Sequence, residues 1–237
     1  MRQIKKWVGG LLAAALLLCA AFGVYCLDYY RMDEQAAQLC ADGAVCESFD
    51  DYMVFRAENS DAGLVFYPGG KVECGAYAPL MEALRERGVT CVLCKMPFNL
   101  AVFKGDAAGH ARELAGSVKR WYIGGHSLGG VMAADYAAKH PDSFQGLLLL
   151  ASYSSADLSH SGLRVLSVYG SKDGVLNRGA YESHRDNLPA DSGELVIAGG
   201  CHAYFGCYGS QKNDGVPAIS QTEQIALTAE AAAAFMK

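Results

Sequence analysis

Basic residues are scarce in this sequence, and it contains no long run of one charge sign. The 237 residues include 20 Lys and Arg against 25 Asp and Glu, which gives a net charge of −5 at pH 7. Proteins that bind nucleic acid usually present a basic face to the phosphates, so we expect no nucleic-acid partner. Internal repeats and low-complexity linkers are also absent, and the length favours one globular domain with a sizeable core.

Patterns that hold a metal or a phosphate are missing as well. Cys91 and Cys94 have the spacing of a redox or zinc motif, but they lie in an apolar run that predicts a strand, so we reject that role. Residues 68–71 (Pro-Gly-Gly-Lys) have neither the glycine spacing of a P-loop nor its Ser or Thr. The sequence therefore predicts no metal and no cofactor.

Charge is absent altogether from residues 7–27. At about 1.5 Å per residue, a helix of this length can cross a hydrocarbon core of about 30 Å. Arg2, Lys5 and Lys6 precede the apolar segment and Asp28 follows it, which predicts a cytoplasmic amino terminus and an extracytoplasmic domain. The alternative is a signal peptide whose cleavage releases a secreted protein. We prefer an uncleaved, single-pass membrane anchor.

The cysteines suggest two disulfides if the chain is exported. Cys40 with Cys46, and Cys201 with Cys207, are close enough in sequence to pair in an oxidising compartment. The alternative is that most of the cysteines are free, small apolar residues. The sequence leaves this choice open.

Beyond the apolar segment, short apolar runs alternate with stretches of helical spacing. Two runs flanking Asp50 and Asp51 predict an antiparallel hairpin over 44–57. Further strands are predicted at 63–67, 89–94, 121–123, 146–151, 163–169 and 194–198. Helical patterns between these strands predict a doubly wound, mostly parallel α/β sheet.

The chain divides into three parts on this basis. Residues 1–27 are the basic start and the transmembrane signal-anchor, 28–42 form a polar, helical spacer, and 43–237 form the folded domain.

Residues 121–139 predict a strand, a sharp turn and a helix, and the turn (residues 125–129) reads G-H-S-L-G. A G-x-S-x-G turn in this context is a nucleophile elbow, which lifts Ser127 above the sheet. The N–H of Leu128 at the start of the helix then faces a developing oxyanion. His126 is interpreted as structural, because its side chain should point away from Ser127.

Asp173 and His202 each follow a predicted strand. The carboxyl ends of parallel strands share one edge of the sheet, so both should lie near Ser127. The chain order is then nucleophile, acid, base, with His202 as general base and Asp173 as the residue that orients it. Asp157 is the alternative acid, but the tight Gly-x-x-Asp-Gly turn favours Asp173.

A second oxyanion donor is expected from the loop at residues 68–71. Gly70 is our first choice and Lys71 the second, because spacing alone does not show which amide points inward.

Three aromatic residues are candidates for substrate binding. Tyr204 and Phe205 follow the base, and Phe98 lies in an apolar loop after the strand at 89–94. They could wall an acyl or aromatic group, or they could simply pack their own loops. Residues 152–162 are too few for a helical cap, so we expect an open site.

These blocks resemble the α/β-hydrolase superfamily. The resemblance lies in residues 66–72, 124–130, 169–174 and 199–205, and it points to compact bacterial members with a minimal lid, akin to dienelactone-hydrolase-like esterases. Pro68 departs from the histidine that many members carry before the glycines. The resemblance implies the α/β-hydrolase fold and hydrolysis of an ester, thioester or related acyl bond.

The first interpretation is therefore an exported, membrane-anchored serine hydrolase that works through an acyl-enzyme, with a small-molecule or lipid-like ester as its substrate. Alternatives are an acyltransferase acting on cell-envelope alcohols and a non-catalytic binding domain that retains the fold. A dehalogenase or epoxide hydrolase needs a carboxylate where this chain has Ser127. The sequence does not predict the oligomeric state.

Overall fold

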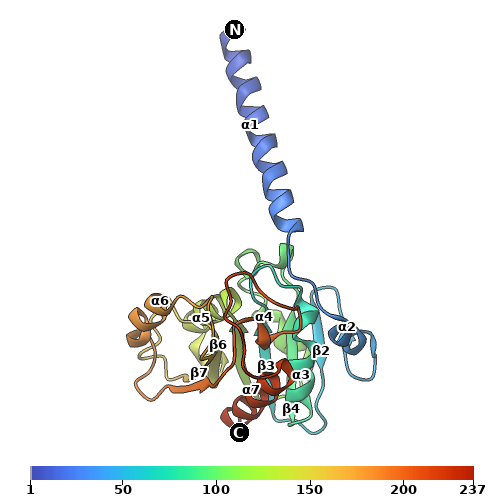
Figure 1. Cartoon of the computed structure of the whole chain (residues 1–237), viewed down its shortest axis with the longest axis vertical. Helices are drawn as coiled ribbons and strands as arrows, with labels where there is room; N and C mark the ends of the chain where they lie inside the picture. The colour runs from blue at the N-terminus through green and yellow to red at the C-terminus, as the bar shows by residue number, and fades with distance from the viewer. Residues whose placement is uncertain (1) are drawn as a thin grey trace.

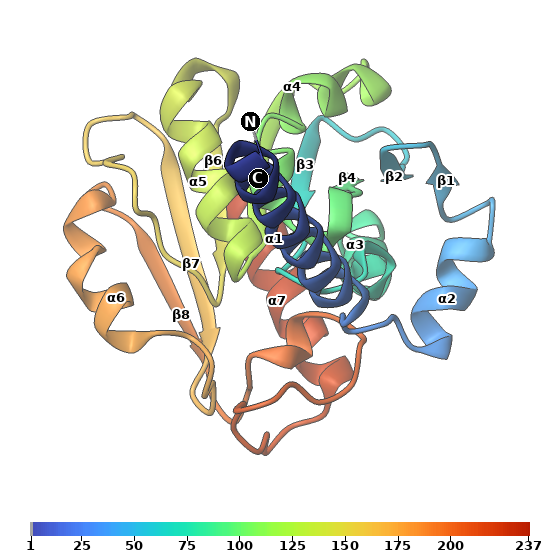
Figure 2. The same ribbon diagram turned by 90° about the horizontal axis from the view of Figure 1, so that it is seen from above.

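The amino-terminal helix extends away from the folded domain. The computed structural model describes residues 2–237. Helix α1 (Arg2–Leu27) rises from the domain as a single long helix (Figure 1), and from above it projects over the middle of the domain (Figure 2). Its segment Gly10–Leu27 has a mean hydropathy of 2.3 and no buried residue. By length and composition this helix suits a membrane span, and a signal sequence has the same features.

One eight-stranded sheet forms the centre of the domain, in the order β1-β2-β4-β3-β5-β6-β7-β8. The first two strands pair with each other, and β2 with β4, in antiparallel fashion, while all other neighbours are parallel. The strands are β1 (Glu47–Ser48), β2 (Tyr52–Phe55), β3 (Ala62–Tyr67), β4 (Val89–Cys94), β5 (Arg120–His126), β6 (Gly146–Leu150), β7 (Arg164–Gly170) and β8 (Gly193–Ile197). The predicted mostly parallel sheet with an antiparallel hairpin at its start is confirmed.

Helices cover both faces of this sheet (Figure 2). The α-helices of the domain are α2 (Glu34–Ala41), α3 (Ala78–Arg85), α4 (Ala108–Ala111), α5 (Leu128–Lys139), α6 (Arg178–Ser183) and α7 (Gln221–Phe235). Short 3₁₀ helices are η1 (Cys74–Tyr77), η2 (Pro97–Asn99), η3 (Ala101–Phe103), η4 (Arg112–Ala115), η5 (Pro141–Ser143), η6 (Arg185–Asn187) and η7 (Ala203–Phe205).

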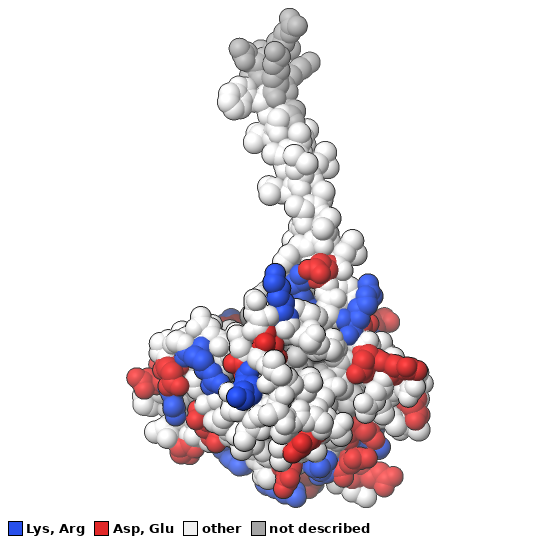
Figure 3. All heavy atoms as spheres, in the orientation of Figure 1, with Lys and Arg blue, Asp and Glu red and all other residues white. Residues whose placement is uncertain are grey.

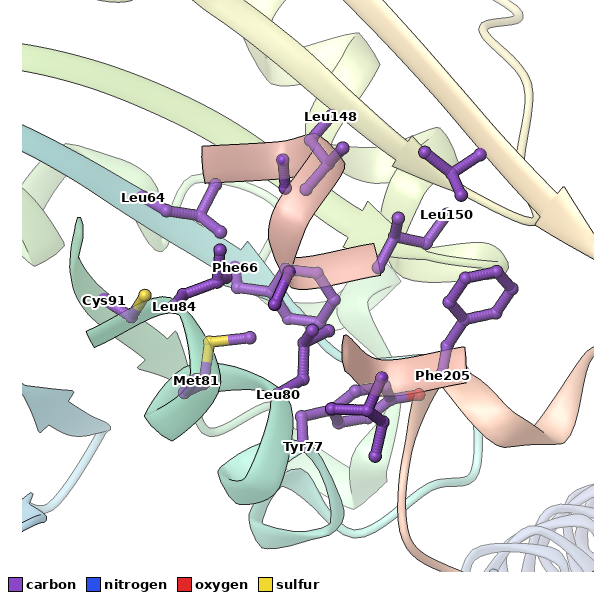
Figure 4. Close-up of a cluster of buried hydrophobic side chains, with 14 of the residues drawn as sticks. Leu64, Phe66, Tyr77, Leu80, Met81, Leu84, Cys91, Leu148, Leu150 and Phe205 are labelled. Atoms are coloured by element: carbon purple, nitrogen blue, oxygen red, sulfur yellow. The ribbon is translucent and has the colours of Figure 1, made fainter. Parts of the chain in front are cut away.

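Alternating side chains of the central strands supply two hydrophobic cores. Leu148 and Leu150 of β6 point into one core, with α3 and α7, whereas Leu147 and Leu149 point into the other, with α4 and α5. Figure 4 shows the first of these cores. A strand has a period of two, so burial on both faces explains why β6 is an unbroken run of leucines.

Residues 28–42, predicted to be a spacer, contact the domain along much of their length. The backbone N–H of Tyr30 donates to the carbonyl of Lys71 (2.8 Å), and the Glu73 N–H donates to the carbonyl of Tyr30 (2.9 Å). Asp33 caps α2 by accepting from the Ala36 N–H, and Ala36 is completely buried. Backbone pairing and apolar burial therefore join this interval to the domain.

The cysteines are all free thiols, so neither predicted pair is bridged in this structure. Cys40 Sγ donates to the Gly75 carbonyl (3.7 Å), and Cys46 is its neighbour. The contact between the two thiols raises the pKa of the Cys40 thiol and lowers that of Cys46. Cys201 and Cys207 are both buried.

Candidate active site

Ser127 occupies the sharp turn between β5 and α5. Its backbone has φ 51° and ψ −123°, a positive φ that a non-glycine residue rarely adopts. Four hydrogen bonds hold the turn. The Ser127 N–H donates to the Leu150 carbonyl (2.9 Å), and the Ser127 carbonyl accepts from the N–H groups of Gly130 (3.0 Å) and Val131 (3.2 Å) and from the Ser152 hydroxyl (2.8 Å). Backbone strain of this kind persists only where the surroundings enforce it.

Glycines on either side of Ser127 let the helix lie directly on the sheet. A Cβ at Gly125 would stand 2.5 Å from the carbonyl carbon of Gly129. A Cβ at Gly129 would stand 2.2 Å from the carbonyl oxygen of Pro68. Both distances are far below van der Waals contact, so the elbow needs glycine at these two positions.

His202 and Asp173 meet at the carboxyl edge of the sheet. His202 Nδ1 lies 2.9 Å from Asp173 Oδ2, and the two side chains are only 1% and 0% exposed. The other carboxylate oxygen of Asp173 accepts from the Val175 and Leu176 N–H groups, both at 2.8 Å. The carboxylate is therefore fixed in place, and Nδ1 of His202 carries the proton that it donates.

This tautomer leaves His202 Nε2 as an acceptor. Within residues 2–237, Nε2 is buried and has no hydrogen-bond partner. The structure records no hydrogen bond from the Ser127 hydroxyl to His202 in the same part of the chain. Hydrogen bonds of catalytic groups are often long in the absence of substrate and shorten in the substrate complex.

His126 contacts His202, the candidate base, as well. Its ring centroid lies 4.5 Å from that of His202, and its Nδ1 lies 2.8 Å from the Tyr77 hydroxyl. The Tyr77 hydroxyl accepts from the Gly69 N–H (3.0 Å), so its own proton points to His126 Nδ1. Burial, and secondly the neighbouring His202, hold the pKa of His126 well below its usual value. A neutral imidazole therefore lies beside His202.

The amides near the elbow show which of them are free to bind an oxyanion. Lys71 N–H donates to the Asn99 carbonyl (2.8 Å), and Gly69 N–H is engaged by Tyr77. In the described part of the chain, no hydrogen bond is recorded for the amides of Gly70 and Leu128. A Cβ at Gly70 would lie 2.9 Å from the Leu128 side chain, so the two residues adjoin. This arrangement favours Gly70 over Lys71 as the second donor.

Sequence reasoning missed Asp214, which links the loop that follows Asp173 to the loop that carries His202. Its carboxylate accepts four backbone N–H groups, from Gly174 (3.1 Å), His202 (3.1 Å), Ala203 (2.8 Å) and Gly215 (2.8 Å). Burial alone would raise the pKa of Asp214, but the amides outweigh it and the pKa is lowered. The only signal in the sequence was an Asn-Asp-Gly turn at 213–215, which says nothing of its partners.

Asp157, the alternative acid, lies elsewhere. Its carboxylate accepts from the backbone N–H (2.9 Å) and the hydroxyl (2.6 Å) of Ser159. No contact with His202 is recorded for it among residues 2–237, whereas Asp173 has one.

A pocket of about 210 Å³ adjoins Ser127. It is lined by Ser127, Leu128, Val131, Ala151, Ser152, Tyr153, Val175, Leu176 and Asn177. None of the three aromatic candidates is among these lining residues. Phe205 is buried against His126 (5.5 Å between ring centroids), Tyr204 lines a separate cavity beside Asp214, and Phe98 packs edge-on against Phe22.

No group of three or more His, Cys, Asp or Glu side chains within residues 2–237 is placed to hold a metal ion.

A sequence model described as "Alpha/beta hydrolase family" matches residues 63–226, which is more than half of the chain. The chain belongs to the alpha/beta hydrolase family. The matched region contains Ser127, Asp173 and His202 together with the Pro-Gly-Gly-Lys loop. No curated protein sequence matches the chain.

Solved structures share the fold of this alpha/beta hydrolase at low sequence identity. Est1E from Butyrivibrio proteoclasticus is 15% identical with a TM-score of 0.57, over 81% of this chain and 96% of that one. A membrane phospholipase A described as a bacterial virulence factor is 16% identical with a TM-score of 0.58, over 95% and 96%. A soluble variant of monoglyceride lipase from Saccharomyces cerevisiae is 12% identical with a TM-score of 0.59, over 81% and 94%. Similarity at this level shows the fold alone.

Proposed function

We propose that this alpha/beta hydrolase is a serine esterase that cleaves carboxylic esters through an acyl-enzyme on Ser127, in a domain held outside the cytoplasm by α1. The observation that carries the proposal is the buried contact of 2.9 Å between Asp173 and His202, beside the strained turn of Ser127. A buried histidine with a fixed Nδ1 partner and an unpartnered Nε2 suits a general base.

The reaction follows from these positions. His202 Nε2 takes the proton of the Ser127 hydroxyl while the oxygen attacks the ester carbonyl carbon. The amides of Leu128 and Gly70 bind the oxyanion, and Asp173 stabilises the imidazolium. His202 then protonates the departing alcohol, and the acyl group stays on Ser127. Water, deprotonated by the same imidazole, attacks the acyl-enzyme and releases the acid.

Two further observations support ester chemistry. The pocket beside Ser127, at about 210 Å³, is smaller than the usual 300–1,000 Å³ of ligand sites, so it receives the reacting end of an acyl group rather than a bulky ligand. The similar structures include an esterase with ferulic acid bound, a phospholipase A and a monoglyceride lipase. The narrower resemblance to dienelactone-hydrolase-like esterases stays a prediction.

The anchoring part of the proposal rests on α1. Its fully exposed apolar segment has the length of a membrane span, and basic residues precede it. An uncleaved anchor predicts that the purified mature protein retains Met1 or Arg2 at its amino terminus, whereas a secreted form begins after the apolar segment.

Steady-state and burst kinetics test the proposed activity. Full-length protein in detergent should hydrolyse p-nitrophenyl esters with a burst of nitrophenol equal to the enzyme present, wherever deacylation is the slower step. Ser127→Ala should remove both the burst and the turnover while it leaves the circular dichroism spectrum unchanged. Turnover that survives Ser127→Ala would contradict the proposal, and acyl transfer to added glycerol in preference to water would indicate a transferase.

A further inference from the structure

Helix α1 contacts the domain through aromatic side chains of one loop. The ring of Phe22 in α1 packs edge-on against Phe98 (5.5 Å between centroids) and Phe103 (5.8 Å), which also pack against each other (5.6 Å). All three are large apolar side chains that remain exposed, at 41%, 54% and 50%. Val102, in the same loop, is 50% exposed. We call residues 97–103 the aromatic loop.

The depth of this contact follows from helix geometry. Phe22 lies five residues before Leu27, the end of the apolar segment, which is about 7 Å along the helix axis at 1.5 Å per residue. A bilayer that accommodates Gly10–Leu27 therefore reaches past the level of Phe22. Phe98 and Phe103, which contact Phe22, lie at the same level. In such a bilayer the exposed rings of Phe98 and Phe103 would be surrounded by lipid chains, whereas in water they would form an exposed apolar patch.

The inner side of the aromatic loop reaches the proposed oxyanion donors. The carbonyl of Asn99 accepts from the Lys71 N–H (2.8 Å), and the Leu100 side chain lies 3.7 Å from the Cβ position of Gly70. The last turn of the aromatic loop, η3, packs on α5, the helix that begins next to Ser127. One short loop therefore extends from the level of Phe22 to the elbow.

A second set of contacts joins the end of α1 to Lys71, the residue that follows the proposed donor Gly70. The Lys71 ammonium lies 4.3 Å from the centre of the Tyr25 ring and 2.7 Å from the Asp28 carboxylate. Lys and Arg side chains lie beside an acidic group where α1 meets the domain (Figure 3). These contacts hold the loop of the proposed oxyanion donor Gly70 close to the end of α1.

The backbone of the aromatic loop is strained where it presents its rings. Phe98 and the next residue, Asn99, have φ values of 56° and 55°. A bulky aromatic residue is a rare occupant of this left-handed region, and the strain serves no core packing because Phe98 is more than half exposed. Strain at an exposed apolar side chain suggests a binding role.

We propose that the aromatic loop is a docking surface for the lipid bilayer that α1 enters, and that the esters which reach Ser127 are acyl lipids of that bilayer. This inference rests on the proposed esterase activity and on α1 as an anchor. An acyl lipid has its ester carbonyl at the boundary between the apolar slab and the headgroups. The lipid therefore moves out of the bilayer only by the length of the aromatic loop before its ester carbonyl reaches Ser127. Its acyl chains stay in contact with the bilayer and with the apolar side chains of this loop.

Depth in the membrane is measured without reference to activity. Full-length Phe98→Trp and, as a control, Leu227→Trp are reconstituted in phosphatidylcholine vesicles with and without brominated acyl chains. Leu227 is 40% exposed and belongs to α7, which lies at the end of the domain opposite α1 (Figure 1). Trp7 and Trp121 are common to both variants, so the emission added by the new indole is obtained by subtracting that of the wild type. We expect the emission added by Phe98→Trp to fall more than twofold with brominated lipid, and that of Leu227→Trp to stay unchanged. Equal quenching in both variants, or none in Phe98→Trp, would overturn the docking surface.

The substrate class is measured in the same vesicles with two esters, a long-chain fluorogenic glycerolipid held in the bilayer and the water-soluble p-nitrophenyl acetate. In the double variant Phe98→Ser/Phe103→Ser, the ratio of kcat/KM for the lipid to kcat/KM for the acetate should fall at least tenfold. Leu227→Ser should leave this ratio unchanged. Wild-type protein that hydrolyses neither ester refutes the proposed function itself. Hydrolysis of acetate but not of lipid, or an unchanged ratio in the double variant, refutes only the bilayer route.

Discussion

The imidazole rings of His126 and His202 lie 4.5 Å apart, and each side chain is almost completely buried. Two histidines in such contact cannot both be protonated without strong repulsion. His126 is the one held neutral, because burial first and His202 second depress its pKa well below the usual 6.5. The residue before Ser127, the proposed nucleophile, therefore forms part of the wall around His202, the proposed base.

This arrangement predicts that the folded protein loses stability in acid because His126 becomes protonated on unfolding. Its pKa is near 6.5 in the unfolded chain and well below that in the folded protein, so the unfolded state binds more protons as the pH falls below 6.5. The free energy of unfolding should decrease over that window by up to about 1.4 kcal/mol per pH unit, and this contribution should be fully present above pH 7. Thermal unfolding of the wild type and of His126→Gln from pH 7.5 to 5 measures it. The control is His110→Gln, whose side chain is 81% exposed. Parallel curves for the wild type and His126→Gln would contradict the assignment.

Asp173 is predicted to be the acid of the site and Asp157 is not. Asp173→Asn keeps the shape of the side chain but removes the charge that orients His202, so kcat should fall on the order of 10³- to 10⁴-fold. Asp157→Asn should change kcat by less than about twofold, because the hydrogen bonds recorded for its carboxylate among residues 2–237 come from Ser159 and not from His202. Both variants are compared by kcat and by Tm. A larger loss in Asp157→Asn would reverse the two roles.

Asp214 is predicted to position the base without touching substrate. Asp214→Ala removes the acceptor of four backbone amides, among them that of His202, and a displacement of the imidazole by about 1 Å can cost up to 100-fold in rate. We expect kcat to fall about 10- to 100-fold while KM changes little. Asp214→Asn, which restores one acceptor oxygen, should recover part of the loss. Exposed Asp191→Ala provides the control. A fall in kcat that only mirrors the fraction of unfolded protein would indicate a merely structural role.

Gly129 is predicted to be irreplaceable, whereas Gly116 is not. The Cβ of Gly129→Ala would lie 2.2 Å and 2.3 Å from the backbone oxygens of Pro68 and Tyr67, neither of which can move without separating α5 from β3. This substitution should cost about 3 kcal/mol or more. Gly116 has φ −60° and nothing within 4 Å of its Cβ position, so Gly116→Ala should be neutral or stabilise by up to about 1 kcal/mol. Urea denaturation of both variants measures the difference, and equal effects would contradict the packing described for the elbow.

The sequence predicted the sheet well because its signals are local. The leucine run of β6 and the alternation of strands and helices depend only on periodicity and burial. Boundaries were less accurate. Helical patterns between the strands did not define where each helix starts: α6 begins at Arg178 because the Asn177 side chain caps it by accepting from the Ala180 N–H (3.0 Å). Between β4 and β5 the helical spacing yields, after the aromatic loop, the short α4 and η4.

Contacts between distant loops were beyond the reach of sequence reasoning. Asp173 could be placed near His202 because both follow parallel strands of one sheet, and the structure brings them into contact. The role of Asp214 depends on how a later loop folds back over two others, and no periodicity encodes that. Likewise, nothing in residues 28–42 indicated that the backbone of Tyr30 would hydrogen-bond to Lys71, in the loop at residues 68–71.

The most direct test of the central claim is active-site labelling of full-length protein. Folded wild type, treated with a fluorophosphonate and digested, should carry the phosphonyl group on Ser127 alone, as located by tandem mass spectrometry. His202→Gln should slow the labelling at least 100-fold, and exposed His160→Gln should not. Folded wild-type protein that remains unlabelled, or that is labelled at Ser152 instead, would contradict the account.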